Sequence, residues 1–460
     1  MKNITRKVTF SLTSLIFVGF LIQFIRHSNS LSTDIALAAT LLTITLLISG
    51  LVMEYLAFLI FMAIVIICKL APAAVTFSGF TSPAFWLIFA GLPIGLAIQK
   101  TGLANRIAYS LIKICKGHYS ILVMGMAAFG MLMAFIMPSS AGRVILILPI
   151  IIAFAKANGF DTESRGHTGL LLSGIFASNI AGFTILPSNL PNIILMGSMS
   201  SLYHLNLTYT GYLLLHFPIL GLLKVILMVV IVTFMFNDRP SLLKLENFIN
   251  LEKVSSAEKR LTLYLVLVLI AWLSDSYTNL SPAWPALAIA VVCLLPKIGI
   301  LDHRNFMKEI NTEILFYVAG LVGLSAVINY TGIGSIIGQE LIAHIPFAAG
   351  HNFFNYYLLT FCSMIIGLLT TLPGIPAIMA PLSGQLAQAT HLPLTTVLIT
   401  QVIGYSMFIL PYQSPPLLIA MRLSNLSFKH VIKLCLIMTA LSIIVIMPLD
   451  YLWLMLNNAI

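Results

Sequence analysis

The stretch MPSSAGRVILILPII, residues 137–151, interrupts an apolar segment that runs from 119 to 156. The residues at its centre are small or polar, and one is charged: Ser139, Ser140, Ala141, Gly142 and Arg143. In hydrocarbon every backbone N–H and C=O needs a partner inside the protein, so a broken helix is tolerated only within the protein or beside a watery cavity. The stretch therefore predicts a membrane protein with a re-entrant hairpin whose tip reaches such a cavity.

Three further interruptions resemble the first. LLTTLPGIPAIMAPL, residues 368–382, breaks the apolar segment 353–388. ILPSNLPNIILMG (185–197) and ILPYQSPPLLIAM (409–421) place two and three prolines inside apolar runs, where proline removes a backbone donor and frees a carbonyl. We expect the first of these three to form a second hairpin and the other two to be breaks within spans.

Composition points to the same class of protein. Of 460 residues, 59% are hydrophobic and only 8% are charged, whereas soluble domains carry about 25% charged residues. The net charge of +10 fits basic residues gathered in cytoplasmic loops, and no basic run with interleaved aromatics indicates nucleic-acid binding. The five cysteines form no CxxC pair, so neither a disulfide framework nor a zinc site is indicated.

The basic residues predict the topology. We expect an all-α polytopic protein of about 11 transmembrane helices, the first near 9–25, plus two re-entrant hairpins. If each hairpin enters and leaves on one side, 20 of the 24 Lys and Arg residues lie inside, in the segments 1–8, 100–118, 156–167, 237–260, 297–312 and 422–433. This asymmetry predicts a cytoplasmic N-terminus in a bacterial-type inner membrane.

The chain also contains an internal repeat. Thr101-Gly102 matches Thr331-Gly332, and the hairpin tips precede Pro149 and Pro381 by the same number of residues. The proline breaks follow in the same order. The offset between matching residues runs from 221 (Glu54 and Asp275) to 232 (Pro149 and Pro381). Because the charge pattern puts the first hairpin inside and the second outside, the copies are predicted to be inverted. Four parts follow: 1–34 (first span and loop), 35–236 (first repeat), 237–260 (cytoplasmic linker) and 261–460 (second repeat).

Inverted repeats with discontinuous helices are the architecture of secondary transporters, whose binding site lies where the breaks meet. A broken helix directs N–H groups and its positive dipole end at the site, which suits an anion. Arg143, the only formal charge between Lys116 and Lys156, is expected to be the counter-charge, since a charge in mid-membrane costs at least ~2.5 kcal/mol and usually faces a functional cavity.

The predicted substrate contacts are Ser139, Ser140, Ala141, Gly142, Arg143, Thr370, Thr371, Gly374, Ser414 and Pro415. The predicted ligands of a coupling cation are Ser139, Ser188, Asn189, Asn192, Thr371 and Gln413. Each break could also be a packing kink. Lys224 is expected to snorkel or to pair structurally, and Trp272 to sit at the membrane interface. Glu54 and Asp275 are expected to anchor turns at the membrane boundary, with a proton relay as the alternative.

At these residues the chain resembles the divalent anion:sodium symporter family, the sodium-dicarboxylate, citrate and sulfate carriers of the ion transporter superfamily. The resemblance rests on the acidic turn at Glu54, the Thr-Gly segments, the two tips with their following Leu148-Pro149 and Ala380-Pro381, and the proline breaks. It implies two sodium sites, a dicarboxylate or sulfate site between the tips, a homodimer and elevator-type movement. The tips depart from the family's Ser-Asn-Thr, reading Ser139-Ser140-Ala141 and Thr371-Leu372-Pro373.

The predicted function is secondary active transport of a small anion, a di- or tricarboxylate or sulfate-like solute, coupled to sodium or protons and using no other cofactor. The expected partners are the solute, membrane lipid and a second copy of the chain. An anion or metalloid effluxer or a sodium/proton antiporter is an alternative, although the breaks contain no carboxylate that an antiporter would need. A membrane enzyme is disfavoured by the lack of HExxH and GxSxG motifs, and a transport-inactive sensor is the alternative from another class.

Overall fold

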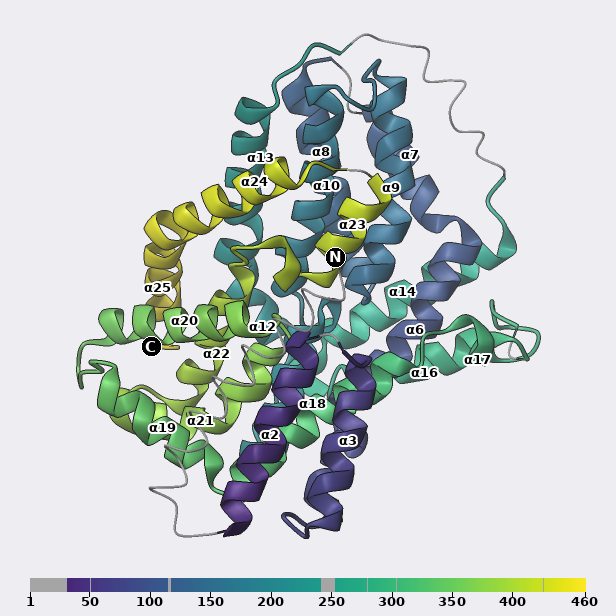
Figure 1. Ribbon diagram of the computed structural model, residues 1–460. Helices are drawn as coiled ribbons and strands as arrows, with labels where there is room; N and C mark the ends of the chain where they lie inside the picture. Colours follow the sequence, from purple (N-terminus) through teal and green to yellow (C-terminus); the bar gives the residue numbers. More distant parts are fainter. Residues whose placement is uncertain are drawn as a thin grey trace.

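The computed structural model describes residues 31–49, 51–114, 117–240, 253–278, 280–302, 304–424 and 426–460, and its regular elements there are all helical (Figure 1). The predicted first span at 9–25 and residues 241–252 of the linker lie outside the described residues. The fold is therefore the all-α polytopic architecture that the sequence predicts.

Seven helical segments of this described part are long and apolar enough to cross a membrane. They are α6 (Pro83–Thr101), α8 (Tyr119–Ile136), α9 (Ser140–Ala157), Tyr209–Met235, α18 (Glu313–Tyr330), α20 (Asn352–Leu369) and Phe428–Leu456. Shorter apolar helices are α2 (Leu31–Ser49), α3 (Glu54–Ile67) and α16 (Ala283–Leu294). One further pair, α21 (Gly374–Thr390) and α22 (Leu394–Ser406), is bent by 119°.

All four predicted interruptions are present. The hairpins are α8 with α9 and α20 with α21, which we call hairpin 1 and hairpin 2. The two breaks, called break 1 and break 2, each contain a 3₁₀ turn. Break 1 joins α10 (Arg165–Phe183), η1 (Leu186–Ser188) and α11 (Leu190–Tyr203), and break 2 joins α22, η4 (Pro411–Gln413) and α23 (Pro415–Ser424). A proline begins each 3₁₀ turn or follows its first residue, where a missing N–H costs no helical bond.

The last span of each half contains a π-helical turn. The first is α12 (Tyr209–His216), η2 (Phe217–Leu223) and α13 (Lys224–Met235), and the second is α24 (Phe428–Leu441), η5 (Ser442–Ile446) and α25 (Met447–Leu456). Pro218 lies within η2 and Pro448 is the second residue after η5, and a proline in a helix interior removes the regular hydrogen bond. Turns of this kind are frequent at functional sites.

Two short helices occupy corresponding places and were not predicted. Gly102 (φ +73°) ends α6 and Gly332 (φ +75°) follows α18, and both adopt the left-handed conformation that glycine tolerates. The helices α7 (Leu103–Ile114) and α19 (Ile333–His344) then begin. Neither is long or apolar enough to appear in a search for spans. The shortest helices, also missed, are α4 (Ala73–Thr76), α5 (Ser78–Thr81), α15 (Asp275–Thr278) and α17 (Phe306–Glu309).

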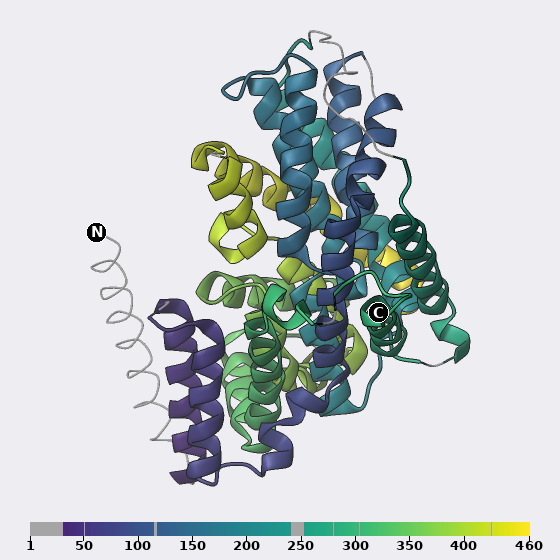
Figure 2. The ribbon, with the colours of Figure 1, turned by 90° about the vertical axis from the view of Figure 1, so that its right-hand side faces the viewer.

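The two halves exchange their first helices. Helices α2 and α3 of the first half pack on α18 of the second, whereas α14 (Ser256–Leu273) and α16 pack on α6 of the first. Gly320 allows the close approach of α3, because a Cβ there would lie 2.3 Å from Phe58 Cβ. Figure 2 shows the purple α2 and α3 beside the green helices of the second half. The order of elements is the same in both halves, and their inverted relation stays a prediction.

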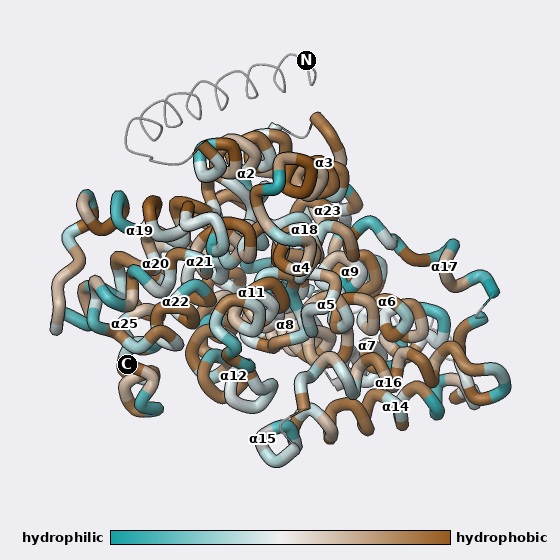
Figure 3. The backbone as a smooth tube through the Cα atoms, turned by 90° about the horizontal axis from the view of Figure 1, so that it is seen from below, coloured by the Kyte–Doolittle hydropathy of each residue, from teal (hydrophilic) through white to brown (hydrophobic). Residues whose placement is uncertain are grey.

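The outer helices present apolar side chains. Leu263, Leu267 and Ile270 of α14 are exposed, and Figure 3 shows α14 and α16 as largely brown, hydrophobic tubes at one rim of the molecule. This surface suits lipid rather than water.

Contacts join the segments that the charge pattern predicts to lie inside. Lys100 forms an ion pair with Glu309, and Arg106 forms one with Glu258. The hydrogen bond to Glu258 raises the pKa of Arg106 above its ordinary value. Segments 100–118, 237–260 and 297–312 therefore lie at the same end of the molecule.

Two more predicted inside segments reach that end. The backbone N–H of Gly166 donates to Asp238 Oδ2 (2.8 Å), which brings in 156–167. The ring of His430 lies 5.3 Å from that of Phe236, beside the linker, which brings in 422–433. The side of the membrane on which this end lies stays a prediction.

We predict that Gly130→Ala destabilises the fold. Helices α8 and α10 approach so closely that a Cβ at Gly130 would lie 2.2 Å from Gly174 O, and overpacking of this kind costs about 1–3 kcal/mol. Gly384→Ala is the matched helical control, because its nearest neighbour would be Tyr203 Oη at 3.8 Å. Thermal unfolding in detergent should show a lower midpoint for Gly130→Ala alone, and equal midpoints would contradict the close approach.

Candidate functional site

Arg143 lies one turn into α9, just behind the tip of hairpin 1, and is 0% exposed. Its Nη1 donates to Met137 O (2.7 Å), Ser188 Oγ (2.6 Å) and Ser188 O (3.1 Å). Nε donates to Ser178 Oγ (2.8 Å) and Nη2 to Ser178 O (3.2 Å). Each guanidinium nitrogen is thus hydrogen-bonded within the protein. The side chain joins hairpin 1 to α10 and η1 of break 1.

The charge of Arg143 has no acidic partner among the residues that the structure describes. Within the described part of the chain, no carboxylate lies within 4.0 Å of it. Gly182 makes room for the guanidinium, since a Cβ there would lie 2.6 Å from Nη2. An unpaired buried charge is costly, so an anion near the tip would be stabilised. Direct contact of Arg143 with substrate stays a prediction, because in this conformation the guanidinium does not reach the surface.

The remaining residues of this tip form the beginning of α9. The Ser139 hydroxyl caps the helix by accepting from Gly142 N (3.3 Å), as an N-cap serine does. Ser140 is buried, whereas Ser139, Ala141 and Gly142 are half-buried. A Cβ on Gly142 would lie 2.9 Å from Met137 Cε, so glycine allows the tip to fold back tightly.

Break 1 brings three predicted cation ligands together. The Ser188 hydroxyl accepts from Arg143 and donates to Ala134 O (2.8 Å). Asn192 Nδ2 donates to Gly182 O (2.9 Å) and Ile185 O (2.8 Å), which the break leaves free. Asn189 Oδ1 accepts from the next backbone N–H (3.0 Å). Asn192 Oδ1 is a buried oxygen with no partner, the kind of ligand that a small hard cation takes.

Hairpin 2 is bonded to break 2 in a comparable way. Leu372 N, at the tip, donates to Gln413 O (3.3 Å). Gln413 Oε1 accepts from the backbone N–H groups of Ile409 and Leu410, both at 2.8 Å. The Thr370 hydroxyl donates to Ile366 O (2.7 Å), within its own helix. Each tip is therefore fastened to the break of its own half.

Packing between the halves brings the four interrupted segments into one region. Helix α9 packs against α23 and α11 packs against α21, and Figure 1 shows α9 and α23 side by side. These four helices begin after Ser139, after Asn189, at Gly374 and at Pro415. Ser414 is buried and Pro415 is exposed. Unpaired N–H groups at helix N-termini bind anions, so this grouping can hold one.

A cavity of about 350 Å³ separates the tip of hairpin 2 from α2, α3 and α18. Three predicted substrate contacts line it, namely Thr370, Thr371 and Gly374. Its volume is within the range of small-molecule sites. The predicted contacts on hairpin 1 do not line this cavity.

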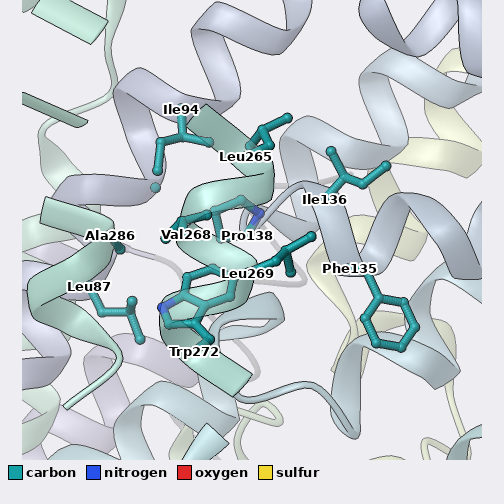
Figure 4. Close-up of a pocket in the computed structure, with 11 residues that line it drawn as sticks. Leu87, Ile94, Phe135, Ile136, Pro138, Leu265, Val268, Leu269, Trp272 and Ala286 are labelled. Atoms are coloured by element: carbon teal, nitrogen blue, oxygen red, sulfur yellow. The ribbon is translucent and has the colours of Figure 1, made fainter. Parts of the chain in front are cut away.

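The corresponding gap at hairpin 1 is closed. Phe135, Ile136 and Pro138 pack against α6, α14 and α16 and leave about 10 Å³. Figure 4 shows apolar side chains filling this gap, with the Trp272 ring beside Pro138. Trp272 is 3% exposed and stacks on Tyr209, because α14 packs against the hairpin and not only against lipid. Its place at the membrane interface stays a prediction.

Glu54 lines the open cavity, and the residues that line this cavity with it include no Lys or Arg. The acidic residue sits at the start of α3, as expected for a turn. A carboxylate in the cavity repels an anion, so the attraction has to come from the helix N-termini and from Arg143. Asp275, the corresponding residue in the second half, is buried and accepts from Tyr209 N.

Two buried charged residues lie away from the tips. Lys224 is 2% exposed and its Nζ donates to Ser406 O (2.7 Å), so it does not snorkel and instead has a structural contact. Asp450, in α25, is 0% exposed and was not singled out from the sequence. The sequence contains a signal that could have identified Asp450, because it is a lone acid in an apolar run. Ionisable residues inside a membrane are candidates for functional residues.

Comparison with known proteins supports this description. The family described as "sodium:sulfate symporter transmembrane region" matches residues 6–458. A membrane protein of Cupriavidus necator is 22% identical over 74% of this chain and 68% of its own length. The L-tartrate/succinate antiporter of Escherichia coli K12 is 26% identical over 57% of this chain, and the inner membrane protein YbhI of the same strain is 23% identical over 63%.

The match spans only 56% of the antiporter and 62% of YbhI. Among solved structures, the Alcanivorax borkumensis YdaH transporter has a similar fold, with a TM-score of 0.55 and 15% identity over 84% of this chain and 88% of that one. At this identity the likeness concerns the fold alone.

We predict that Arg143→Met destabilises the protein far more than Lys156→Met, at the exposed end of the same helix. The change leaves carbonyl and hydroxyl acceptors of Met137, Ser178 and Ser188 without donors, at about 1–3 kcal/mol for each acceptor left buried. Thermal unfolding in detergent measures both variants. Equal midpoints would show that the guanidinium does not hold break 1 together.

Proposed function

Because the chain belongs to the family of the sodium:sulfate symporter transmembrane region, a family of transporters and not of enzymes, we propose that it is a secondary transporter that exchanges small dicarboxylates across a bacterial inner membrane. The observation that carries the proposal is the buried charge of Arg143, which has no acidic partner among the described residues. The dicarboxylate class is suggested by the relatives named L-tartrate/succinate antiporter.

The charge distribution supports an anionic substrate. Arg143 lies behind the first turn of α9, so its charge adds to the positive end of that helix dipole. The hydroxyls of Ser139 and Ser140 lie at the same end, and α23 packs alongside. A carboxylate at this place would receive backbone N–H groups and hydroxyls while it balances the guanidinium.

The unequal gaps support alternating access. Hairpins 1 and 2 face the outer helices at corresponding places, yet one gap measures about 10 Å³ and the other about 350 Å³. An elevator movement of the hairpins and breaks past α2, α3, α6, α14, α16 and α18 would close the open gap and open the closed one. The inverted repeat, the cytoplasmic N-terminus and the homodimer are parts of this proposal.

Sodium remains one candidate coupling ion. Asn192 Oδ1 and the carbonyls at break 1 could ligate it, with Ser139 and Asn189 close in sequence to the same tip and break. In the second half, Thr371 and Gln413 occupy the corresponding positions of hairpin 2 and break 2. The absence of an acidic ligand at both places would make such sites weak.

Transport is tested with purified protein in liposomes. We expect uptake of radiolabelled succinate that internal succinate or L-tartrate accelerates and that external L-tartrate inhibits, with internal sulfate as the comparison. Protein-free liposomes and the Lys156→Met variant are the controls. If internal sulfate accelerates the uptake and neither internal dicarboxylate does, the substrate class is sulfate-like and not dicarboxylate. No uptake with any of the three internal anions would contradict the proposed function.

The elevator movement is tested by cysteine accessibility in a background without the five native cysteines. Ile378→Cys lies in the open gap and Leu269→Cys in the closed one. A water-soluble maleimide should label Ile378→Cys at rest and Leu269→Cys only when succinate is present on both sides. Labelling of Leu269→Cys that is unaffected by succinate would argue against the movement.

A further inference from the structure

The two spans that contain π-helical turns place opposite charges inside the protein. Lys224 directly follows η2, and Asp450 lies four residues after η5. Helix α25 packs against η2, and the two π-helical turns pack against each other. The exposed fractions of Lys224 and Asp450 are 2% and 0%. The last spans of both halves thus meet at a pair of buried ionisable groups.

Each member of this pair contacts a different part of the second half. Lys224 Nζ donates to Ser406 O (2.7 Å) and Ser406 Oγ (3.4 Å). Ser406 is the last residue of α22, so the ammonium lies at the negative end of the helix that leads into break 2. Tyr356 Oη, on the first helix of hairpin 2, donates to Asp450 Oδ2 (2.9 Å). Asp450 Oδ1 is buried and has no hydrogen-bond partner among the described residues.

Lys224 and Asp450 interact electrostatically but form no ion pair within 4.0 Å. A closed ion pair would hold both groups in their charged forms. Here the carboxylate has one hydrogen bond and one free oxygen, so a proton can add to the free oxygen without breaking the existing contact. A buried carboxylate with a partner held at a distance is suited to gain and lose a proton.

Other titratable groups surround the pair. Tyr357 and Tyr451 contact the Tyr356 ring at 5.8 and 5.5 Å, on the Asp450 side. On the Lys224 side, Tyr405 precedes Ser406 and its hydroxyl lies 2.9 Å from Tyr212 Oη.

Two further polar features lie on the Lys224 side. The His216 ring is 4.6 Å from that of Tyr212, and neither ring nitrogen has a hydrogen-bond partner in the part of the chain that the structure describes. A cavity of about 10 Å³, which is close to the size that holds one water, is lined by Lys224, Ser406 and Ser442.

A proton would change the net charge buried in the hairpin-bearing helices. In the described parts of α8–α13 and α20–α25, the buried Lys, Arg, Asp and Glu residues are Arg143, Lys224 and Asp450. With all three ionised their formal charge is +1, and a bound dianion makes it −1. A proton on Asp450 brings the loaded set to zero, which lowers the cost of moving it through a low-dielectric region.

We propose that Asp450 is the binding site of a coupling proton, with Lys224 as its charge partner and Tyr356 as its positioning residue. This inference rests on the proposed dicarboxylate transport and names its coupling ion. The carboxylate takes up one proton to become a carboxylic acid, and no other bond changes. Sodium does not fit this place, because Lys224 repels it and the carboxylate offers a single free oxygen.

Two contacts connect the pair to the substrate site, namely that of Lys224 with Ser406 and that of Asp450 with Tyr356. Lys224 fixes the end of α22, and break 2 that follows is bonded to the tip of hairpin 2 through Gln413 and Leu372. Tyr356 belongs to that same hairpin. Neutral Asp450 leaves the charge of Lys224 uncompensated, and a dianion among the helix N-termini then becomes its counter-charge.

Proton binding is read directly by infrared difference spectroscopy of the purified full chain between acid and alkaline buffer. We expect a carboxylic-acid carbonyl band at acid pH that Asp450→Asn removes and the exposed Asp161→Asn retains. A wild-type spectrum in which Asp450→Asn removes no band would overturn the proposal whatever the substrate is. This readout needs no transport, so it stands even if the dicarboxylate assignment fails.

Coupling is read in liposomes with radiolabelled succinate at clamped membrane potential. With one proton per succinate, an inward gradient of one pH unit should drive about tenfold accumulation without sodium. Asp450→Asn should lose this accumulation and keep succinate–succinate exchange, whereas Asp450→Glu should restore it in part. Tyr356→Phe should move the pH of half-maximal uptake upward, because the carboxylate loses a hydrogen bond that favours its charged form.

The outcomes separate the two proposals. Wild-type exchange that is indifferent to the pH gradient, or accumulation that persists in Asp450→Asn, overturns the proton site and leaves the transporter assignment intact. Absence of all succinate movement in the wild type overturns the dicarboxylate assignment, and the infrared band then decides the proton site. If Asp450→Asn fails to fold, the shift in Tyr356→Phe decides, because a purely structural tyrosine would change the amount of folded protein and not the pH of half-maximal uptake.

Discussion

The fold depends on how the broken helices satisfy their backbone groups without water. At hairpin 1 and break 1 the guanidinium of Arg143 donates to the carbonyl oxygens of Met137, Ser178 and Ser188, and Asn192 donates to those of Gly182 and Ile185. At break 2 the Gln413 amide oxygen accepts from Ile409 and Leu410. These side chains replace the missing helical bonds, so the chain can expose helix N-termini inside a membrane.

The two halves solve this problem with different chemistry. The first half uses a positive charge, Arg143, behind its tip, whereas the second uses the neutral amide of Gln413. The last spans also differ, with a buried Lys224 in the first half and a buried Asp450 in the second. This asymmetry matches the unequal gaps, since hairpin 1 is packed against the outer helices and hairpin 2 is separated from them by the cavity that Glu54 lines.

Burial determines what each charged residue requires from its surroundings. Exposed at an interface, Arg143 and Lys224 would be ordinary basic residues of a membrane protein. Buried, each requires a counter-charge, and in the described residues neither has one in direct contact. A dianion and a proton are the charges that balance the set. In the proposed mechanism, substrate and coupling ion both follow from this one electrostatic requirement.

The sequence by itself determined the membrane class, the four interruptions, the order of the repeat and the family, because apolar run length, prolines and glycines act locally. It also identified Arg143 as a charge where none is expected. It missed α7 and α19, because helices this short resemble loops in the sequence, and it did not single out Asp450. Only the tertiary structure decided that Lys224 meets Ser406 and that Asp450 meets Tyr356, because these residues come from spans 182 and 94 positions apart. Burial and partnership of an ionisable group depend on which helices pack together, and no local pattern contains that information.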